Sequence, residues 1–228
     1  MIIYGKQVCF YALKHHSDKI ETIYVTKLSI LPKEALAKFG SKIKTIQNQW
    51  AQKLSRGGNH QGILIEIQEP KPMDIKDIKN SEFVLILDSL TDVGNIGAII
   101  RSAYALGVDG VVATGVKQLN LSAIVRTSAG AALDMVPLIL PNALSLLNEL
   151  SQIGFKLYGA DMNGEPLSKA TFNQKRVLVL GSEDRGISKK IKEKLDNIYK
   201  IEMKREFDSL NVSAAAAIFL YRMSYAVK

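Results

Sequence analysis

Residues 83–101 read F-V-L-I-L-D-S-L-T-D-V-G-N-I-G-A-I-I-R and predict a strand, a loop and the start of a helix. The first six residues form an apolar run bounded by turn-forming residues, which is typical of a short buried strand. Gly94 permits a tight turn, and Asn95 can cap a helix that we expect to span about 95–106 and to end at Gly107. A strand that is apolar at successive positions is typical of a parallel sheet covered on both faces.

The same alternation of strands and helices continues to the end of the chain. Further short apolar strands are predicted at 110–114, 154–160, 177–180 and about 198–202, and helices after Pro141, from Ser188 and over about 211–226. Strands separated by helices predict an α/β fold with a mostly parallel sheet. Ligands of such sheets bind among the loops at the carboxyl ends of the strands, so we expect the functional site there.

The N-terminal part predicts a separate small α/β domain over residues 1–70. Its pattern contains a strand at 20–26, a helix at 32–39 and a strand at 62–67. Residues 71–81 are polar. Pro70 precedes this segment and Pro72 lies within it, and both prolines disfavour helix and sheet alike. We therefore expect a linker at 71–81 and a second domain over 82–228.

Composition excludes several classes of protein. The chain of 228 residues contains one cysteine and three histidines, so neither a disulfide framework nor a site built from several thiolates is possible. No stretch approaches 18 uncharged apolar residues, and the N-terminus lacks the pattern of a secretion signal. We expect a reduced, metal-free protein of the cytoplasm, with no membrane partner.

Positive charge is concentrated in the first domain. The formal net charge is +8, and residues 1–79 carry 13 Lys or Arg against 7 Asp or Glu, whereas residues 80–228 carry 17 against 15. The basic residues in the middle of the first domain are accompanied only by Glu34; they are Lys33, Lys38, Lys42, Lys44, Lys53 and Arg56. Such a run suits the phosphates of a nucleic acid, although a solvated helix face explains it equally well.

Three loops that follow or close predicted strands carry more polar and glycine residues than a connection needs. The first contains Asn95 and leads to Arg101, an isolated cation on an otherwise apolar helix. Such a cation favours an anionic partner, although a surface position would also explain it. The second loop, 180–188, reads L-G-S-E-D-R-G-I-S, where Gly181 lets backbone amides approach a ligand and Glu183 adds an acceptor. A plain turn from strand to helix would also explain this loop.

The third loop, 201–213, reads I-E-M-K-R-E-F-D-S-L-N-V-S and ends in three short polar side chains at alternate positions. One of them would suffice to cap the helix that follows. Ser209 and Asn211, with Ser213, therefore indicate a cluster that binds something besides the helix, although capping alone remains an alternative.

Common nucleotide-binding and hydrolase motifs are absent from the sequence. No G-x-G-x-x-G follows the strand at 83–88, and G-V-V-A-T-G at 110–115 continues as V-K rather than K-S or K-T. H-E-x-x-H and G-x-S-x-G are also missing. These absences disfavour dinucleotide-binding enzymes, P-loop NTPases, zinc proteases and serine hydrolases.

The three loops, in this order and spacing, resemble the three signature motifs of the SpoU (TrmH) branch of the SPOUT methyltransferases. The specific elements are S-L-N-V-S at 209–213 and G-S-E-x-x-G at 181–186; I-Y-G at 3–5 and H-Q-G-I at 60–63 resemble an L30e-like RNA-binding domain. The resemblance implies a C-terminal domain with a trefoil knot, preceded by the small RNA-binding domain. It also implies S-adenosylmethionine as methyl donor, held near Gly181, Ile201, Met203 and Leu210, and a homodimer formed through the knotted domain.

The resemblance further implies roles for five side chains in methylating a ribose 2'-hydroxyl. Arg101 would activate the hydroxyl, either as an unusual base or as a cation that stabilises the developing alkoxide. We favour stabilisation, because a guanidinium group rarely gives up its proton. Asn95 and Glu183 would orient Arg101 and the ribose, while Ser209 and Asn211 would hold the third loop against donor and nucleotide. The chain departs from the family pattern at Val93, where proline is common, and at Glu202 and Arg205 in place of the usual proline and glycine of I-P-M-x-G.

Chain length and the N-terminal domain most resemble the members that methylate a guanosine in 23S ribosomal RNA. A transfer RNA is the alternative substrate. A catalytically silent RNA-binding relative is a further alternative, but such a protein would be expected to lose Arg101 or the polar residues of the third loop. Structured RNA is the expected partner in each of these cases, whereas an unrelated nucleotide-binding enzyme, the remaining alternative, would bind a nucleotide instead.

Overall fold

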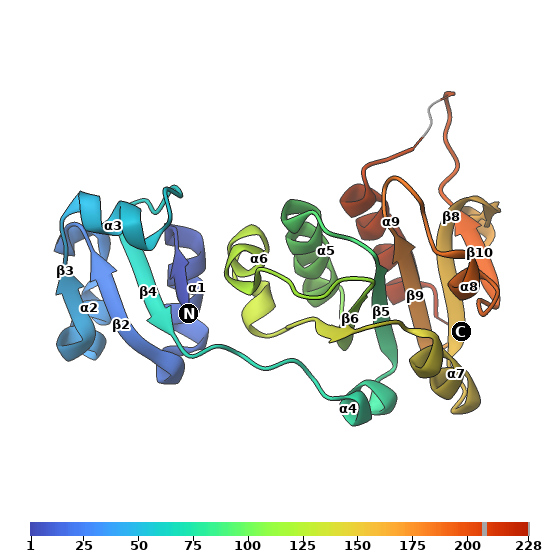
Figure 1. The fold of residues 1–228 in the computed structure, drawn as a ribbon, viewed down its shortest axis with the longest axis horizontal. Coiled ribbons are helices and arrows are strands. Elements are labelled where there is room, and N and C mark those ends of the chain that lie inside the picture. The colour runs from blue at the N-terminus through green and yellow to red at the C-terminus, as the bar shows by residue number, and fades with distance from the viewer. Residues whose placement is uncertain (207–208, 228) are drawn as a thin grey trace.

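The computed structural model describes residues 1–206 and 209–227, which form two α/β domains side by side (Figure 1). The first contains a four-stranded sheet in the order β1-β4-β2-β3, in which β4 runs antiparallel to β1 and β2, and β3 runs parallel to β2. Its elements are β1 (Ile2–Tyr4), α1 (Lys6–His15), β2 (Ile20–Val25), α2 (Lys33–Phe39), β3 (Ile43–Thr45), α3 (Asn48–Leu54) and β4 (Ile63–Ile67).

The second domain contains a six-stranded sheet in the order β10-β8-β9-β5-β6-β7, and every neighbouring pair in it is parallel. Its elements are β5 (Phe83–Asp88), α5 (Val93–Ala105), β6 (Gly110–Thr114), α6 (Leu121–Thr127), β7 (Leu138–Leu140), α7 (Leu144–Gln152), β8 (Lys156–Pro166), β9 (Arg176–Gly181), α8 (Lys189–Lys192), β10 (Asn197–Lys200) and α9 (Val212–Tyr225). The predicted α/β class and parallel sheet are confirmed. The trefoil knot implied by the resemblance stays a prediction, because strand order alone does not test it.

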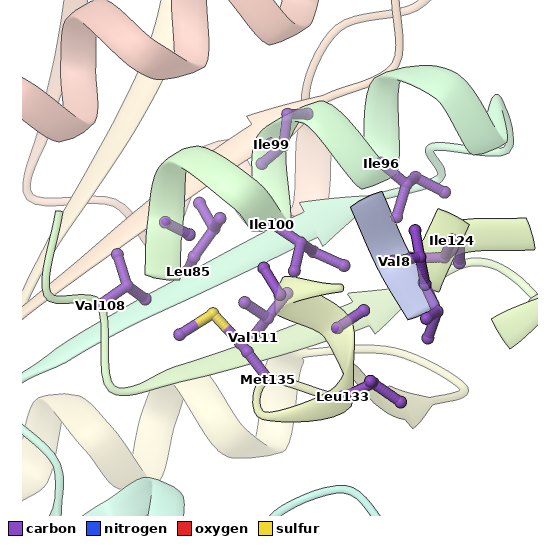
Figure 2. Packing of buried hydrophobic residues seen from close by; sticks show 14 of the residues in the cluster. Val8, Leu85, Ile96, Ile99, Ile100, Val108, Val111, Ile124, Leu133 and Met135 are labelled. Atoms are coloured by element: carbon purple, nitrogen blue, oxygen red, sulfur yellow. The ribbon is translucent and has the colours of Figure 1, made fainter. Parts of the chain in front are cut away.

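The central strand β5 is buried on both faces, as its unbroken apolar run predicts. Leu85 and its neighbours two residues away pack against α5, α6 and α9, whereas Val84 and Ile86 pack against α7 and α8. Figure 2 shows Leu85 in the first of these clusters with Ile99 and Ile100 of α5. The register of β5 with its two neighbours places its last residue, Asp88, beside Thr114 of β6 and Gly181 of β9.

The expected linker, residues 71–81, contains a short helix that its prolines do not favour. Residues 75–80 form the helix α4 (Ile75–Asn80), whose first turn is capped by Asp74 through a bond from the Asp77 amide (2.8 Å). Ile78 of this helix is fully buried under the second sheet. The segment therefore packs as part of the second domain, because one apolar side chain in a polar run was enough to hold a short helix.

Helix α1 packs the first domain against the second. Val8 of α1 belongs to the same apolar cluster as Ile124 of α6 (Figure 2). The Tyr11 hydroxyl donates to Asp134 (2.6 Å), and His16 Nε2 also lies 3.2 Å from that carboxylate. Apolar contact and a polar pair together fix how the two domains sit relative to each other.

Helices α5 and α9 run parallel and begin at the same edge of the sheet. Asn211, at the start of α9, donates to Asn95 in the first turn of α5 (3.0 Å), and Ser224 near the end of α9 donates to the Leu106 carbonyl. The two helix N-termini therefore lie together. In the described ranges 1–206 and 209–227, no helix is both long enough and apolar enough to cross a bilayer.

Gly97 tests the packing that holds α5 in place. A Cβ atom at this position would lie 2.0 Å from Thr127 Oγ1 of α6, so Gly97→Ala should lower the free energy of unfolding by about 1–3 kcal/mol. An unobstructed glycine-to-alanine change in a helix stabilises instead. Gly40, with helical backbone angles and nothing within 4 Å of its Cβ position, is the matched control, and Gly40→Ala should leave stability unchanged or raise it. Thermal unfolding of both variants measures the difference, and equal melting temperatures would contradict this packing.

Candidate functional site

Three loops meet at the carboxyl ends of β5, β9 and β10. Strands β5 and β9 are neighbours, and their last residues, Asp88 and Gly181, lie side by side in the sheet register. The loops that follow them, 89–92 and 182–188, therefore leave the sheet together. The third loop joins β10 to α9 and returns to the same place, since α9 starts beside α5.

The Glu183 carboxylate joins all three loops. Its Oε1 atom accepts hydrogen bonds from Asn95 Nδ2 (3.1 Å), from Asn211 Nδ2 (3.0 Å) and from the Val212 amide (3.4 Å). Asn211 Nδ2 also donates to Asn95 Oδ1 (3.0 Å). Bonds to an ionised acceptor are stronger than neutral ones, and negative charge is favoured at helix N-termini. We call Asn95, Glu183 and Asn211 the polar triad.

Asn95 does not cap α5, which corrects the sequence prediction. The cap is Asp92, whose Oδ1 atom accepts from the Asn95 amide at 2.7 Å. Asn95 lies inside the first turn, where its side chain is not needed by the helix. Both ends of its side-chain amide can therefore bond to the other two loops.

Asn211 caps α9 and also bonds beyond the helix, as the excess of polar residues indicates. Its Oδ1 atom accepts from the Ser213 amide (2.9 Å) and the Ser213 hydroxyl (2.5 Å), while its Nδ2 atom donates to the triad partners. One side chain thus fixes both the start of α9 and the position of the third loop.

The Asp88 side chain holds the second loop in place, and Asp88 was not among the predicted site residues. This carboxylate is buried, and it accepts from the Ser188 amide (2.9 Å) and the Thr114 hydroxyl (3.2 Å). An acidic residue that ends an otherwise apolar strand was the available signal. A buried carboxylate needs such partners, because an unpaired charge there would be costly.

Gly181 has a structural reason to be glycine. The loop folds back so closely that a Cβ atom on Gly181 would lie 2.0 Å from the backbone of Gly186. Gly186 itself has φ +64° and donates its amide to the Ser182 carbonyl (2.8 Å). The two glycines allow a tight loop that presents Glu183 to the other two loops.

An apolar pocket of about 420 Å³ lies on the other side of the third loop from the polar triad. Its lining comes from β8, from β10 and the residues after it, and from the start of α9: Ala160, Asp161, Met162, Tyr199, Lys200, Ile201, Glu202, Met203, Ser209, Leu210, Ala215 and Phe219. The structure thus brings together Ile201, Met203 and Leu210, three of the four expected donor-binding residues, with Ser209. Gly181 lies outside this lining, at the end of β9.

Two carboxylates border this pocket, and only one of them was noted in the sequence. Burial would raise the pKa of Asp161, but its ion pair with Lys192 (2.5 Å) and the Asn163 amide hold that pKa below its usual value. Glu202 accepts a hydrogen bond from the Ser168 hydroxyl, which lowers the pKa of Glu202. Glu202 thus binds a neighbouring loop at a position where the family pattern has proline.

A second, smaller hollow of about 260 Å³ opens over the polar triad. It is lined by Ser89, Leu90, Thr91, Asp92, Asn95, Ser182, Glu183, Asp184, Arg185 and Val212. Residues 209–212 contribute to both linings, since Ser209 and Leu210 line the apolar pocket and Val212 lines this hollow. The site therefore consists of an apolar compartment and a polar compartment that share one short segment of the chain.

Arg101 lies apart from the polar triad. It is exposed in the third turn of α5, six residues after Asn95, which places it about 9 Å further along the helix axis. Within residues 1–206 and 209–227, Arg101 makes no hydrogen bond or ion pair. Asn95 and Glu183 thus form hydrogen bonds with each other and with Asn211. The resemblance implies a different role for them, which is to orient Arg101.

Two protein families match the chain, and together they cover both domains. Residues 82–221 match the SpoU rRNA Methylase family. Residues 2–73 match the family described as RNA 2'-O ribose methyltransferase substrate binding.

Similar proteins and structures agree with these matches. The chain is 30% identical over 223 residues to the 23S rRNA (guanosine-2'-O-)-methyltransferase RlmB of Bordetella pertussis, over 92% of this chain and 90% of that protein. It is 31% identical over 206 residues to an uncharacterized tRNA/rRNA methyltransferase of Borreliella burgdorferi, over 83% and 90% of the two chains. The fold is shared with the SpoU methyltransferase AviRb from Streptomyces viridochromogenes, with a TM-score of 0.78 and 22% identity over 98% of this chain and 89% of that one. The chain therefore belongs to the SpoU rRNA methylase family.

Proposed function

We propose that the chain transfers a methyl group from S-adenosylmethionine to the ribose 2'-hydroxyl of a guanosine in 23S ribosomal RNA. The observation that carries this proposal is the pairing of the apolar pocket with the polar triad across residues 209–212. The reaction needs a donor and a ribose held in line, and such positioning supplies much of the catalysis of group transfer. Two compartments that share one wall suit that requirement.

The apolar pocket fits the methyl donor. Its volume of about 420 Å³ lies within the range of small-molecule sites, and it is mostly apolar with a few polar groups at its edge. When bound, the donor supplies an activated methyl group together with its own leaving group. Backbone around Ile201 and Leu210 would hold it, with Ser209 as one of the polar groups of the lining. AviRb and an rRNA methyltransferase from Sinorhizobium meliloti were both solved with this donor, which supports the assignment.

Arg101 would stabilise the negative charge that develops on the ribose oxygen while the hydroxyl proton passes to solvent water. A protonated guanidinium that is exposed and makes no bond within the described chain can turn to a developing negative charge. Asn95 and Glu183 would bind the nucleotide in the polar compartment, and Ser209 and Asn211 would hold the third loop between donor and nucleotide. These roles are proposals drawn from the family pattern and the placement of the side chains.

A homodimer through α9 is part of the proposal. The outer face of this helix leaves Ile218, Tyr221 and Tyr225 exposed by 39%, 58% and 73%. They recur at the spacing of one helix face, and a contiguous apolar face on a surface helix favours a protein interface. Helix α5 packs beside α9, so a dimer formed there would border Arg101.

Ribosomal RNA is the substrate that the relatives favour. Those named RlmB from several bacteria act on a 23S rRNA guanosine, and the chain covers 90% of the one from Bordetella pertussis. A relative from Bacillus subtilis is named a TrmH family tRNA/rRNA methyltransferase, which keeps transfer RNA as the alternative. The retained polar triad and Arg101 argue against a catalytically silent RNA-binding protein. The cytoplasmic setting expected from the sequence belongs to the same proposal.

Arg101→Ala should slow methyl transfer by about two to three orders of magnitude. A positioned cation at developing charge contributes about 3–4 kcal/mol to the transition state. Transfer of radiolabelled methyl groups to unmodified ribosomal RNA measures the rate, with circular dichroism and donor binding as controls for the fold. Near-normal turnover in a folded, donor-binding variant would exclude this role.

Filling the apolar pocket should abolish donor binding. Ala215 of α9 lines the pocket, whereas Ala37 of α2 in the first domain is exposed and lies outside that lining. Calorimetry with S-adenosylmethionine should therefore show binding to the Ala37→Leu control and a loss of at least about tenfold in affinity for Ala215→Leu. ATP and NAD should not bind the wild-type chain. Equal donor affinity in the two variants would place the donor elsewhere.

The substrate is tested by comparing maps of 2'-O-methylation in ribosomal and transfer RNA from cells with and without the gene. Loss of one guanosine methyl in 23S ribosomal RNA is the expected result. Loss of a transfer-RNA methyl, with ribosomal RNA unchanged, would replace the substrate while leaving the reaction in place.

A further inference from the structure

Trp50 is the single tryptophan of the chain, and it faces solvent. Its side chain is 61% exposed on α3, where the next residue, Ala51, is the one that packs into the core. Lys53 Nζ lies 5.6 Å from the centroid of the Trp50 ring, within the range of a cation–π contact. The ring therefore presents an aromatic surface with a cation beside it, and it contributes little to the core.

The stretch of sequence around Trp50 is basic, and no acidic residue within it offsets the positive charge. Residues 35–65 contain five Lys or Arg and no Asp or Glu. Lys44 on the edge strand β3, Lys53 on α3 and Arg56 after it are all exposed. An exposed aromatic ring within a basic surface suits the bases and phosphates of a nucleic acid, whereas a protein partner would have to be strongly acidic.

The loop that follows α3 holds Arg56 in a defined place. Arg56 and Gln61 both have left-handed backbone conformations (φ 51° and 52°), which non-glycine residues adopt infrequently. The Gln61 side chain accepts from the Lys6 amide (2.8 Å), which fastens the loop to the start of α1. Strained backbone of this kind persists where the surrounding contacts fix it, and it is common at ligand-binding sites.

Contacts lead from this loop to the polar triad. Gly58 packs so closely on the Tyr4 ring that a Cβ atom would lie 2.3 Å from the Tyr4 hydroxyl. The Arg126 guanidinium of α6 lies 5.6 Å from the centroid of the same ring. The next residue, Thr127, donates to the Val93 carbonyl (2.9 Å) at the start of α5. In Figure 1, α3 and the carboxyl end of β9 both lie in the upper half of the view, toward opposite ends of the long axis, with α6 and α5 between them.

We propose that Trp50 stacks on an unpaired nucleobase of the RNA substrate, while Lys53 and Arg56 bind the phosphates beside it. The inference rests on the proposed function and adds a place where a base outside the target nucleotide is held. An unpaired base is required, because the faces of bases inside a duplex are already stacked on their neighbours. Arg126 lies between this position and the polar triad and would bind the connecting backbone.

Because Trp50 is the single tryptophan, its fluorescence reports on this position alone. The wild-type chain is titrated with a stem–loop RNA carrying an unpaired loop, and with a fully paired duplex of the same length. Stacking should quench the Trp50 emission strongly with the stem–loop and little with the duplex. Anisotropy of end-labelled RNA follows binding independently in both titrations.

Affinity for the stem–loop should fall about 5- to 100-fold in Trp50→Ala, in line with the contribution of one stacked base, and Trp50→Phe should restore most of it. Ile75→Ala is the matched control: Ile75 is 41% exposed on α4, at the other side of the molecule, and its loss should not change RNA affinity (Figure 1). Circular dichroism establishes that each variant is folded.

The outcomes separate this inference from the proposed function. RNA binding and methylation with unchanged Trp50 emission, or with equal quenching by both RNAs, would overturn the stacking proposal and leave the proposed function intact. If Trp50→Ala bound RNA as tightly as the wild-type chain, the stacking proposal would also be overturned, and a protein would become the favoured partner of Trp50. Failure of the wild-type chain to bind any RNA would overturn both.

Discussion

The hydrogen bonds of the Glu183 carboxylate hold the site together. Three segments that lie far apart in the chain meet there. The second loop contributes the acceptor, and the other two contribute the donors: Asn95 from the start of α5, and Asn211 with the Val212 amide from the third loop. Two parallel helices begin at this carboxylate, so their N-terminal dipoles favour its charge. Without it, the Asn211–Asn95 bond alone would link the third loop to the rest of the polar triad, and residues of this loop also line the apolar pocket.

The strands that determine the sheet could be predicted because each is buried on both faces. The expected strands at 83–88 and 110–114 match β5 and β6 residue for residue. Two helices that depend on contact between the domains, α1 and α6, were not predicted from the sequence; they pack on each other. The sequence of α6 also shows no clear apolar periodicity. The short helix in the linker was missed for a similar reason, since it depends on burying Ile78 under a sheet that the local sequence does not reveal.

The sequence predicted which residues belong to the site better than it predicted the contacts between them. The polar residues of the three loops stood out because each loop carried more of them than a connection needs, and Asn95, Glu183 and Asn211 do meet. The sequence could not show that Asp92 takes the capping role, since either residue can cap a helix. Asp161 was missed altogether, because it belongs to a long strand and its partner Lys192 lies 31 residues later.

In the proposed function, the triad at Glu183 assembles the site for ribose methylation. The most direct measurement is the rate of methyl transfer from labelled S-adenosylmethionine to unmodified ribosomal RNA by Glu183→Ala. Loss of the carboxylate leaves three donors without their shared acceptor, so the rate should fall by about two orders of magnitude or more in a folded protein. A rate equal to that of the wild-type chain would contradict the account.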